Sequence, residues 1–164
     1  MASLQKWSAL WDAYPDYYNY PDSAEVKKMI GGAVNDAWIT NTCAIRLSRA
    51  LNYNGFPIPF NFAGLNTVRG NDRKRYAFRV RELRPWLQYV LGKPGFDHLK
   101  KAGTPFDKKT LADFKGIIGF DIHFSDATGH LDLWDGNVFS SEYHATPDYW
   151  VAASRISLWK AIPS

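Results

Sequence analysis

The chain has 164 residues, of which 46% are hydrophobic, 16% aromatic and 22% charged. This composition is far from the low hydrophobicity and high charge of disordered chains, and the length suits one compact domain with a sizeable core. We therefore expect a single folded domain over residues 1–164. The formal net charge of +4 favours an anionic partner.

The sole cysteine of the chain cannot form an intramolecular disulfide, so the fold has to be stable without one. The N-terminal segment MASLQKWSALWDAYPDYYNYPD has no basic stretch followed by an apolar run, so we expect no signal peptide of the Sec type. No stretch reaches the apolar length of a membrane span. These features predict synthesis in the cytoplasm and no membrane insertion.

The first half of the chain is predicted to be helical. Residues 3–13 place leucine and tryptophan side chains at helical spacing, and the prolines of YPDYYNYPD end that pattern. A second helix is predicted to begin at Ser23 and to end at the glycine pair 31–32. A third covers residues 41–52, before NYNGFPIPF ends it.

The third predicted helix, NTCAIRLSRALN, carries Cys43 in its first turn. Asn41 and Thr42 are both able to cap its free backbone N–H groups. Its apolar positions have the i, i+3, i+4, i+7 spacing of one buried face: Cys43, Ala44, Leu47, Ala50 and Leu51. Arg46 and Arg49 fall outside that spacing, so we expect both arginines to lie off the buried face.

The second half of the chain has mainly strand patterns. Residues 76–91 alternate at first and then continue as a helix that tolerates Pro85 near its start, and a short helix or turn is predicted at 107–115. KGIIGFDIHF at 115–124 and HLDLWDG at 130–136 are predicted strands, and the tail YWVAASRISLW suggests a closing strand. Asp135-Gly136 is a hairpin signal. Helices first and strands last predict an α+β fold rather than a doubly wound parallel sheet.

Cys43 is the candidate nucleophile, although a free cysteine is often an inert core residue. A helix N-terminus and a neighbouring imidazole both favour a thiolate, and the N–H of Cys43 itself could hold an oxyanion. His130 directly follows a glycine at the start of a strand, where a helix can approach. His98 and His144 lie in loop-like segments, and His123 lies inside an apolar run. We therefore predict that Cys43 and His130 form a pair.

Two other interpretations concern clusters of charge. The segment 121–135 holds six potential metal ligands: Asp121, His123, Asp126, His130, Asp132 and Asp135. Their spacing matches none of the specific zinc patterns, so we expect neither a metal nor a cofactor. The basic run 69–85 is either a solvated face or a surface for an anionic partner, and a non-catalytic module that binds nucleic acid is the alternative function.

Taken together, three segments resemble the type VI secretion amidase effectors of the fourth family, which belong to the NlpC/P60-like cysteine peptidases. They are NTCAIRLSRALN around Cys43, the arginine-rich run into VRELRPWL, and GIIGFDIHFSDATGHLDLWDGN at residues 116–137. The combination of Cys-Ala-Ile-Arg with a later Gly-His-hydrophobic-Asp-Leu-Trp carries the resemblance. It extends from about residue 20 to the hairpin after residue 136.

The resemblance implies a papain-like NlpC/P60 fold, in which the nucleophile helix packs on an antiparallel sheet that presents the histidine. It implies hydrolysis of the γ-D-glutamyl to meso-diaminopimelate amide of peptidoglycan, with Cys43 as nucleophile and His130 as base. It also implies delivery by the type VI secretion apparatus into the periplasm of rival bacteria, and a cognate immunity protein that blocks the active-site cleft. Neither a cofactor nor nucleic acid is expected. A cysteine hydrolase acting on another amide is a further alternative.

The residue that orients His130 departs from the family pattern. The aspartate that the family has after this histidine, across the hairpin, falls by count on Ser141, next to Glu142. A shift of one residue would let Glu142 take the role, and we rank it first. Ser141, Asp132 on the strand of the histidine, and His144 are the alternatives. Two arginines near the nucleophile are the candidates for holding wall carboxylates: Arg46 and Arg49.

Overall fold

The computed structural model describes residues 2–124 and 127–163. Its α-helices are α1 (Trp7–Ala13), α2 (Ser23–Ile30), α3 (Cys43–Asn52), α4 (Val80–Leu91) and α5 (Tyr149–Ala152). Its strands are β1 (Thr67–Arg69), β2 (Arg75–Ala77), β3 (Phe96–Leu99), β4 (Gly116–Asp121), β5 (Gly129–Trp134) and β6 (Arg155–Lys160). Three short 3-10 helices complete the described elements: η1 (Gly32–Asn35), η2 (Lys108–Leu111) and η3 (Glu142–His144).

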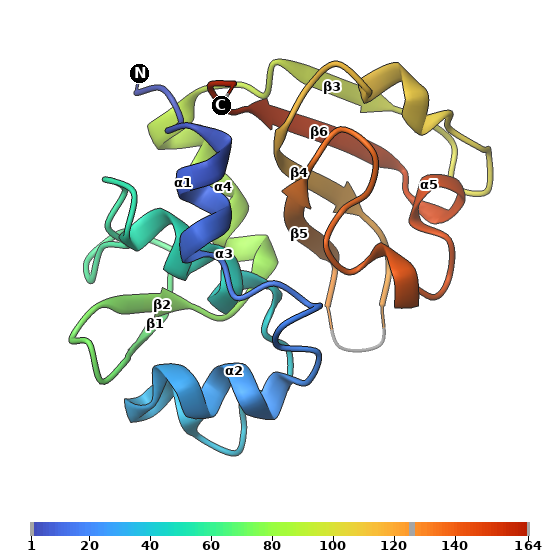
Figure 1. Ribbon diagram of the computed structural model, residues 1–164. Helices are drawn as coiled ribbons and strands as arrows, with labels where there is room; N and C mark the ends of the chain where they lie inside the picture. Colours follow the sequence, from blue (N-terminus) through green and yellow to red (C-terminus); the bar gives the residue numbers. More distant parts are fainter. Residues whose placement is uncertain (1, 125–126, 164) are drawn as a thin grey trace.

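A four-stranded antiparallel sheet with the strand order β3-β6-β4-β5 divides the molecule into two layers. Helices α1, α3 and α4 pack on one face of this sheet, and α5 with η2 covers the other (Figure 1). Strands β1 and β2 form a separate two-stranded sheet. The α+β fold with an antiparallel sheet, expected from the order of the elements, is confirmed.

Strand β4 runs through the centre of the sheet and is buried on both faces. Ile117 packs into the cluster with α3 and α4, whereas Ile118 and Phe120 pack into the cluster with Trp150 of α5. Because both faces are covered, the strand is a continuous apolar run rather than an alternating one. Its neighbour β5 is an edge strand that contacts α3, so side chains on this face of β5 meet that helix.

Helix α3 is the most deeply packed helix. All its residues except Cys43 and Arg49 are buried. The Ser48 hydroxyl donates to the Ala44 carbonyl at 2.7 Å and accepts the Ala77 N–H at 3.0 Å, which ties the helix to β2. The helix predicted for residues 41–52 is therefore confirmed, and Cys43 is held at its N-terminal end by the packing of the whole element.

The ends of the described chain lie side by side (Figure 1). The first helix begins at Trp7 rather than at residue 3, because Lys6 forms a parallel bridge with Ile162 and the Trp7 N–H donates to the Ile162 carbonyl at 3.0 Å. The closing strand is β6, and the first part of the predicted tail strand is instead α5, whose first turn is capped by the Asp148 carboxylate at the Trp150 N–H, 2.9 Å away.

The basic residues of the run 69–85 lie on β1, β2 and α4 and on the segments between them, and four of them are exposed: Arg69, Arg73, Arg79 and Arg81. The guanidinium of Arg75 lies 4.2 Å from the ring centroid of Phe60, and that of Arg79 lies 4.8 Å from the ring centroid of Phe78. Arg84 donates to the Ser157 hydroxyl at 2.6 Å. Much of the positive charge is therefore engaged within the domain.

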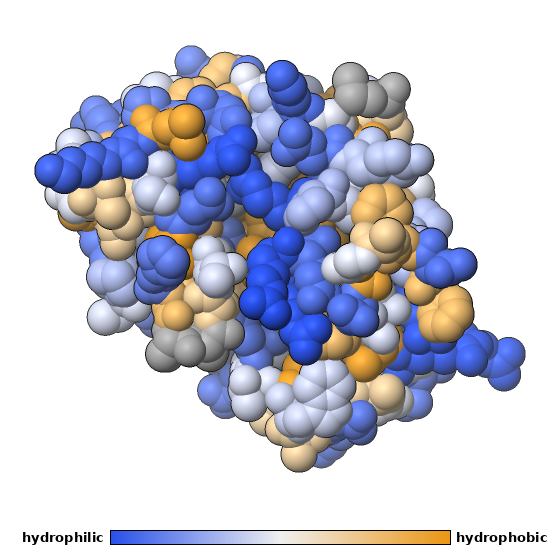
Figure 2. All heavy atoms as spheres, turned by 180° about the vertical axis from the view of Figure 1, so that it is seen from behind, coloured by the Kyte–Doolittle hydropathy of each residue, from blue (hydrophilic) through white to orange (hydrophobic). Residues whose placement is uncertain are grey.

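The surface is mixed in character. On the face opposite to that seen in Figure 1, hydrophilic residues predominate and hydrophobic ones form small separate patches (Figure 2). Within residues 2–124 and 127–163, none of the helices has the length and apolar character needed to cross a membrane.

Candidate active site

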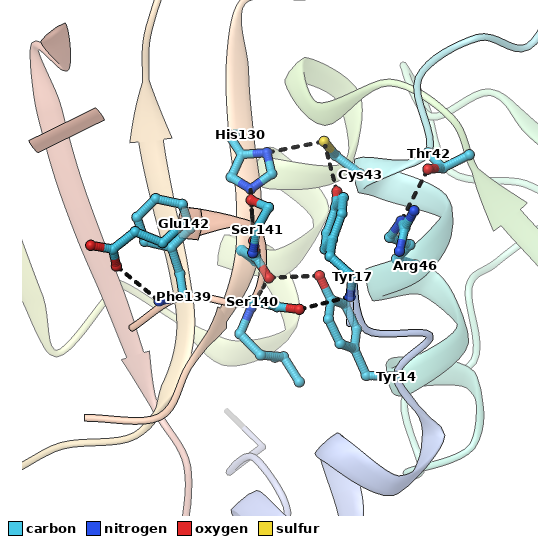
Figure 3. Close-up of polar contacts among 12 residues, drawn as sticks. Tyr14, Tyr17, Thr42, Cys43, Arg46, His130, Phe139, Ser140, Ser141 and Glu142 are labelled. Atoms are coloured by element: carbon cyan, nitrogen blue, oxygen red, sulfur yellow. Dashed lines mark hydrogen bonds and ion pairs between the residues drawn. The ribbon is translucent and has the colours of Figure 1, made fainter. Parts of the chain in front are cut away.

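The structure brings Cys43 and His130 into direct contact. Cys43 is the first residue of α3, and His130 is the second residue of β5. The Cys43 Sγ lies 3.0 Å from Nδ1 of the His130 ring (Figure 3). The histidine is buried, with 3% of its surface exposed, whereas the cysteine is partly exposed. The pair therefore combines a thiol within reach of solvent with an imidazole that the core holds in place.

A buried carboxylate lies on the other side of the imidazole. The Oδ2 atom of Asp132 is 2.9 Å from Nε2 of His130. The same carboxylate accepts hydrogen bonds from the Tyr14 hydroxyl at 2.7 Å, the Leu133 N–H at 2.8 Å and the Ser141 N–H at 3.0 Å. These donors satisfy both carboxylate oxygens, as burial of a charge requires. Asp132 is therefore fixed in position.

Ser141 belongs to the same cluster. Its hydroxyl donates to Oδ2 of Asp132 at 2.7 Å and lies 3.0 Å from Nε2 of His130. The position that the family count assigned to the third residue thus contacts the ring. Ser141 and Asp132 therefore both contact Nε2, the ring nitrogen of His130 that faces away from the thiol.

Glu142, the residue ranked first for orienting the histidine, points elsewhere, so that ranking is corrected. Its carboxylate accepts from the Lys108 ammonium at 2.8 Å, the Trp150 indole N–H at 3.2 Å and the Phe139 N–H at 3.2 Å. The residue begins the 3-10 helix η3, and this turn directs its side chain toward η2 and α5 rather than toward His130.

The two remaining alternatives have different outcomes. Asp132 lies on the same strand as His130, two positions after it. The ring extends along β5, so its Nδ1 faces α3 while its Nε2 reaches the residue two positions on. His144 packs its ring 5.5 Å from that of Tyr17, and among the described residues it makes no hydrogen bond to His130.

The two arginines proposed to hold substrate are both engaged inside the protein. Arg46 is fully buried, so the expectation that it lies off the buried face is wrong. The segment after α1 covers that side of the helix, and Arg46 donates to its Pro15 and Tyr20 carbonyls. Arg49 lies 3.8 Å from the Asp72 carboxylate and 4.6 Å from the Tyr53 ring centroid.

Two further residues contact the nucleophile and were not predicted as site residues. The Tyr17 hydroxyl lies 3.5 Å from the Cys43 Sγ. The Asn41 side chain accepts the Cys43 N–H at 2.9 Å, so it satisfies the helix N-terminus and occupies the donor expected to hold an oxyanion. Asn41 was one of two predicted caps; the aromatic segment around Tyr17 has no spacing that would have assigned it to the site.

The metal interpretation finds no support in the geometry. Asp126 lies outside the described residues. Elsewhere in the described chain, no group of three or more histidine, cysteine, aspartate or glutamate side chains is arranged to hold a metal ion. The Asp132 and His130 side chains instead bond one another.

The electrostatics favour a charged pair. Burial raises the pKa of the Cys43 thiol, but the charge of His130 and its hydrogen bond outweigh this, so the thiol pKa lies below its ordinary value. Burial lowers the pKa of His130, but the Cys43 thiolate and the Asp132 hydrogen bond raise it to about 10. Burial also opposes ionisation of Asp132, yet the hydrogen bonds from His130, Tyr14 and Ser141 leave its pKa lowered.

The site therefore places a thiol of lowered pKa, an imidazole of raised pKa and a carboxylate in a row, an arrangement that favours the thiolate–imidazolium form of the pair. These are the groups that acyl transfer by nucleophilic catalysis requires: a nucleophile, a group that exchanges a proton with it, and a group that orients the second. A cysteine at the start of a helix that packs against an antiparallel sheet carrying the histidine is the arrangement of the papain-like NlpC/P60 fold, and this defines the class of the protein.

Residues 39–159 match the model of the type VI secretion system (T6SS) amidase effector protein 4 family, Tae4. Because the match covers well over half of the chain, the protein belongs to this family. It is therefore an amidase effector of the type VI secretion system, and the resemblance seen in its sequence is confirmed.

Solved structures agree over nearly the whole chain. The Tae4–Tai4 effector–immunity complex from Enterobacter cloacae matches with a TM-score of 0.82 and 31% identity, covering 96% of this chain and 99% of the other. Tae4 from Enterobacter cloacae alone gives 0.80 and 32%, covering 98% and 100%. The Tae4/Tai4 system of Salmonella typhimurium gives 0.82 and 29%, covering 96% and 99%. Among curated proteins, no significant match was found.

Proposed function

We propose that this protein is a cysteine amidase that hydrolyses the γ-D-glutamyl to meso-diaminopimelate amide of peptidoglycan stem peptides, with residues 1–164 as one amidase domain. The observation that carries the proposal is the 3.0 Å contact between the Cys43 Sγ and Nδ1 of His130, backed by a buried carboxylate at 2.9 Å. Membership of an amidase effector family supports an amide as the bond that is cut.

In the first half-reaction, the Cys43 thiolate attacks the carbonyl carbon of the scissile amide. A carbon–sulfur bond forms, and the carbonyl electron pair moves onto oxygen. When the tetrahedral intermediate collapses, His130 donates its Nδ1 proton to the leaving nitrogen, the carbon–nitrogen bond breaks, and the diaminopimelate amine departs. A thioester between Cys43 and the glutamyl carbonyl remains.

In the second half-reaction, water attacks the thioester carbonyl while His130, now neutral, accepts its proton at Nδ1. The carbon–sulfur bond breaks, the glutamyl carboxylic acid leaves and ionises, and the thiolate and imidazolium are restored. Asp132 and Ser141 contact Nε2 and so hold the ring in one orientation during both proton transfers at Nδ1. The Cys43 N–H is a donor for the oxyanion once substrate displaces the Asn41 oxygen from it.

Two cavities border the site, one at Asn41 and one at His130. A cavity of about 340 Å³ is bordered by Asn41, Phe78, Arg79, Val80, Arg81, Phe124, Ala127 and Thr128. A second cavity of about 300 Å³ reaches His130 and shares Val80, Arg81 and Thr128 with the first. Arg81 is exposed and borders both spaces, so it is better placed than Arg46 or Arg49 to meet the carboxylates of a stem peptide.

We propose that toxicity is restrained by an immunity protein of the kind named in the matched complexes, in which Tae4 is bound to Tai4. Tyr18 and Tyr143 are more than half exposed, and their rings stack with centroids 5.1 Å apart. The Tyr143 hydroxyl donates to the Tyr17 carbonyl at 2.7 Å, so this aromatic surface adjoins the nucleophile. A protein that plugs the cleft would cover it.

Membership of the same family supports a proposal for where the protein acts. The protein is made in the cytoplasm, leaves by the type VI apparatus, and acts on the wall in the periplasm of the target cell. An effector injected in this way needs no export signal of its own.

The bond that is cut is tested with a purified muropeptide that contains one γ-D-glutamyl to meso-diaminopimelate amide. Mass spectrometry of the products should show a fragment that ends in D-glutamate and a second that begins with diaminopimelate. A matched peptide joined through the α-carboxyl of D-glutamate is the control and should stay intact. Cleavage at another amide, or of neither peptide, would overturn the proposed substrate and favour a different amide.

A further inference from the structure

Arg46 is a buried cation that the reaction described above does not use. It lies one helical turn after Cys43 in α3, and 0% of its surface is exposed. A charge in such a position is strongly unfavourable unless a counter-charge or hydrogen bonds compensate for it. A buried guanidinium next to a catalytic thiol therefore needs an explanation.

The neighbours of the guanidinium are neutral. Nε donates to the Thr42 hydroxyl at 3.0 Å, and Nη1 donates to the carbonyls of Pro15 at 2.9 Å and Tyr20 at 2.8 Å. Nη2 is buried without a hydrogen-bond partner. Within residues 2–124 and 127–163, no carboxylate lies at ion-pair distance from Arg46. Hydrogen bonds to neutral oxygens stabilise its positive charge in part, but no carboxylate of the described residues neutralises it.

The acidic groups close in sequence to its acceptors Pro15 and Tyr20 do not form an ion pair with it. Asp16 is buried, but its carboxylate accepts from the N–H groups of Tyr18 and Asn19 and from the Asn19 amide. Asp22 and Glu25, at the start of α2, are exposed. The segment between α1 and α2 instead places an aromatic ring, that of Tyr17, against the guanidinium.

Tyr17 lies between the cation and the nucleophile. The Arg46 guanidinium carbon is 3.6 Å from the centroid of the Tyr17 ring, and the hydroxyl of that ring is 3.5 Å from the Cys43 Sγ (Figure 3). A cation on the face of a phenol is attracted by the ring and makes its O–H a stronger donor. The order guanidinium, phenol, sulfur places a positive charge behind a hydrogen bond that ends on the thiolate.

We propose that Arg46 is a positioning residue for the nucleophile, which holds the Tyr17 phenol against Cys43 and favours the thiolate through its unneutralised charge. The other groups that face the thiol are His130 at 3.0 Å and, behind it, Asp132. The role depends on the proposed function only in taking Cys43 as the nucleophile. It explains why a cation is buried here without a carboxylate: the negative charge that it complements is the thiolate.

The pKa values agree with this order of groups. Burial raises the pKa of Tyr17 well above its ordinary value, the Cys43 thiolate adds to this rise, and the Arg46 charge opposes it. The Tyr17 hydrogen bond is in turn one of the interactions that lower the pKa of the Cys43 thiol against the effect of burial.

The test is the rate of alkylation by iodoacetamide as a function of pH, which reports the thiolate fraction and needs no substrate. Cys43 is the sole cysteine, so the reaction has a single target. In a folded Arg46→Met variant, the midpoint should rise by about one pH unit, which is about a tenfold loss of rate below the midpoint. Arg46→Lys should stay near the wild-type midpoint, because it keeps the charge. Arg49→Met, on the same helix, is the matched control and should leave the midpoint unchanged.

Tyr17→Phe keeps a ring beside the guanidinium and removes only the hydroxyl. It therefore tests whether the hydroxyl carries the effect of Arg46 to the thiol, even if Arg46→Met does not fold. Its midpoint should also rise. A wild-type midpoint in Tyr17→Phe, or in a folded Arg46→Met, would overturn the proposal, and an Arg46→Lys midpoint as high as that of Arg46→Met would overturn the electrostatic role. Because alkylation is independent of turnover, a protein that cuts no muropeptide would refute the proposed function without deciding this measurement.

Discussion

His130 connects the two halves of the site. Its Nδ1 faces the thiol of α3, and its Nε2 faces a carboxylate and a hydroxyl that belong to the sheet and to the segment after it. An imidazole bonded on both sides cannot rotate without losing one of these contacts. The orientation of the ring is therefore fixed before substrate binds, which is the condition for efficient proton transfer.

The choice of orienting residue leads to a direct comparison of two variants. Asp132→Asn should lower kcat/KM by about 10²- to 10⁴-fold, because an amide neither stabilises the imidazolium nor fixes the proton of the neutral ring at Nε2, which leaves Nδ1 free to accept a proton. Glu142→Gln should lower it by less than about threefold, since that side chain bonds Lys108 and Trp150 instead. Steady-state cleavage of a muropeptide measures both. A larger loss in the glutamate variant would contradict the assignment.

The pH dependence of kcat/KM follows from the same residues. The thiolate forms as pH rises through the pKa of Cys43, which lies below its usual value, and the imidazolium is lost as pH rises through the pKa of His130, about 10. Activity should therefore rise on the acid side of pH 9 and fall near pH 10. A profile that only begins to rise at pH 9 would show a thiol with no help from its neighbours.

Among the elements, β4 and β6 support the site, because β4 lies between β6 and β5 in the sheet. The site therefore depends on how closely β4 and β6 approach each other. Gly116 pairs with Lys160, and a Cβ at Gly116 would collide with the Trp159 carbonyl. The glycine therefore allows the backbones of β4 and β6 to lie close together in the sheet that supports β5.

Gly116→Ala should lower the free energy of unfolding by about 1–3 kcal/mol, because the clash is with backbone atoms that cannot move aside cheaply. Gly95→Ala is the control: its added methyl group meets only the flexible Lys160 side chain, so we expect a change within about 0.5 kcal/mol. Urea unfolding curves compare the two. Equal stabilities would show that β4 and β6 can separate without cost.

The sequence predicts the elements that have strong hydrophobic patterns. Helix α3 and strands β4 and β5 are long and buried, so their periodicity is clear, and with them come the positions of Cys43 and His130. Strands β1 and β3 were not predicted, because they are short and partly or largely exposed, and only pairing with β2 and β6 makes them strands. Tertiary pairing of this kind leaves no local signal.

The errors at the site have similar causes. Helical spacing placed Arg46 off the buried face, since the covering segment comes from residues before α2 and not from the helix itself. Counting along the chain led to Ser141, which does contact the ring, and an assumed shift of one residue led to Glu142. The direction of a side chain in a 3-10 turn, however, depends on its tertiary partners. Asp132 was in the sequence motif, but its role depends on the rotation of the neighbouring ring, which spacing does not specify.

At the scale of the whole molecule, acidic side chains are tied to partners on other elements. Asp97 of β3 receives two hydrogen bonds from the Arg155 guanidinium of β6, at 2.7 and 2.6 Å, and these lower its pKa. The pKa of the buried Asp132 is lowered by its own donors. Such carboxylates link stability to pH across the domain.

The direction in which stability changes with pH follows from the lowered pKa values of these carboxyl groups. A carboxyl group whose pKa is lower in the folded state stabilises the fold above its unfolded pKa, and this contribution is lost as pH falls through the folded pKa. The free energy of unfolding should therefore decrease as pH falls below about 4. Asp97→Asn should be less stable than wild type at pH 6 and should lose less stability on acidification. Urea midpoints from pH 6 to pH 2.5 measure this, and parallel curves for the two proteins would contradict it.

The proposed function requires that a cysteine of this domain breaks amide bonds in peptidoglycan. The most direct measurement is the release of peptide fragments from purified meso-diaminopimelate sacculi by wild type and by Cys43→Ala, side by side, with circular dichroism to show that both are folded. Fragments cut after D-glutamate should appear with wild type and not with the variant. Equal release by the two proteins, or no release by either, would contradict the account.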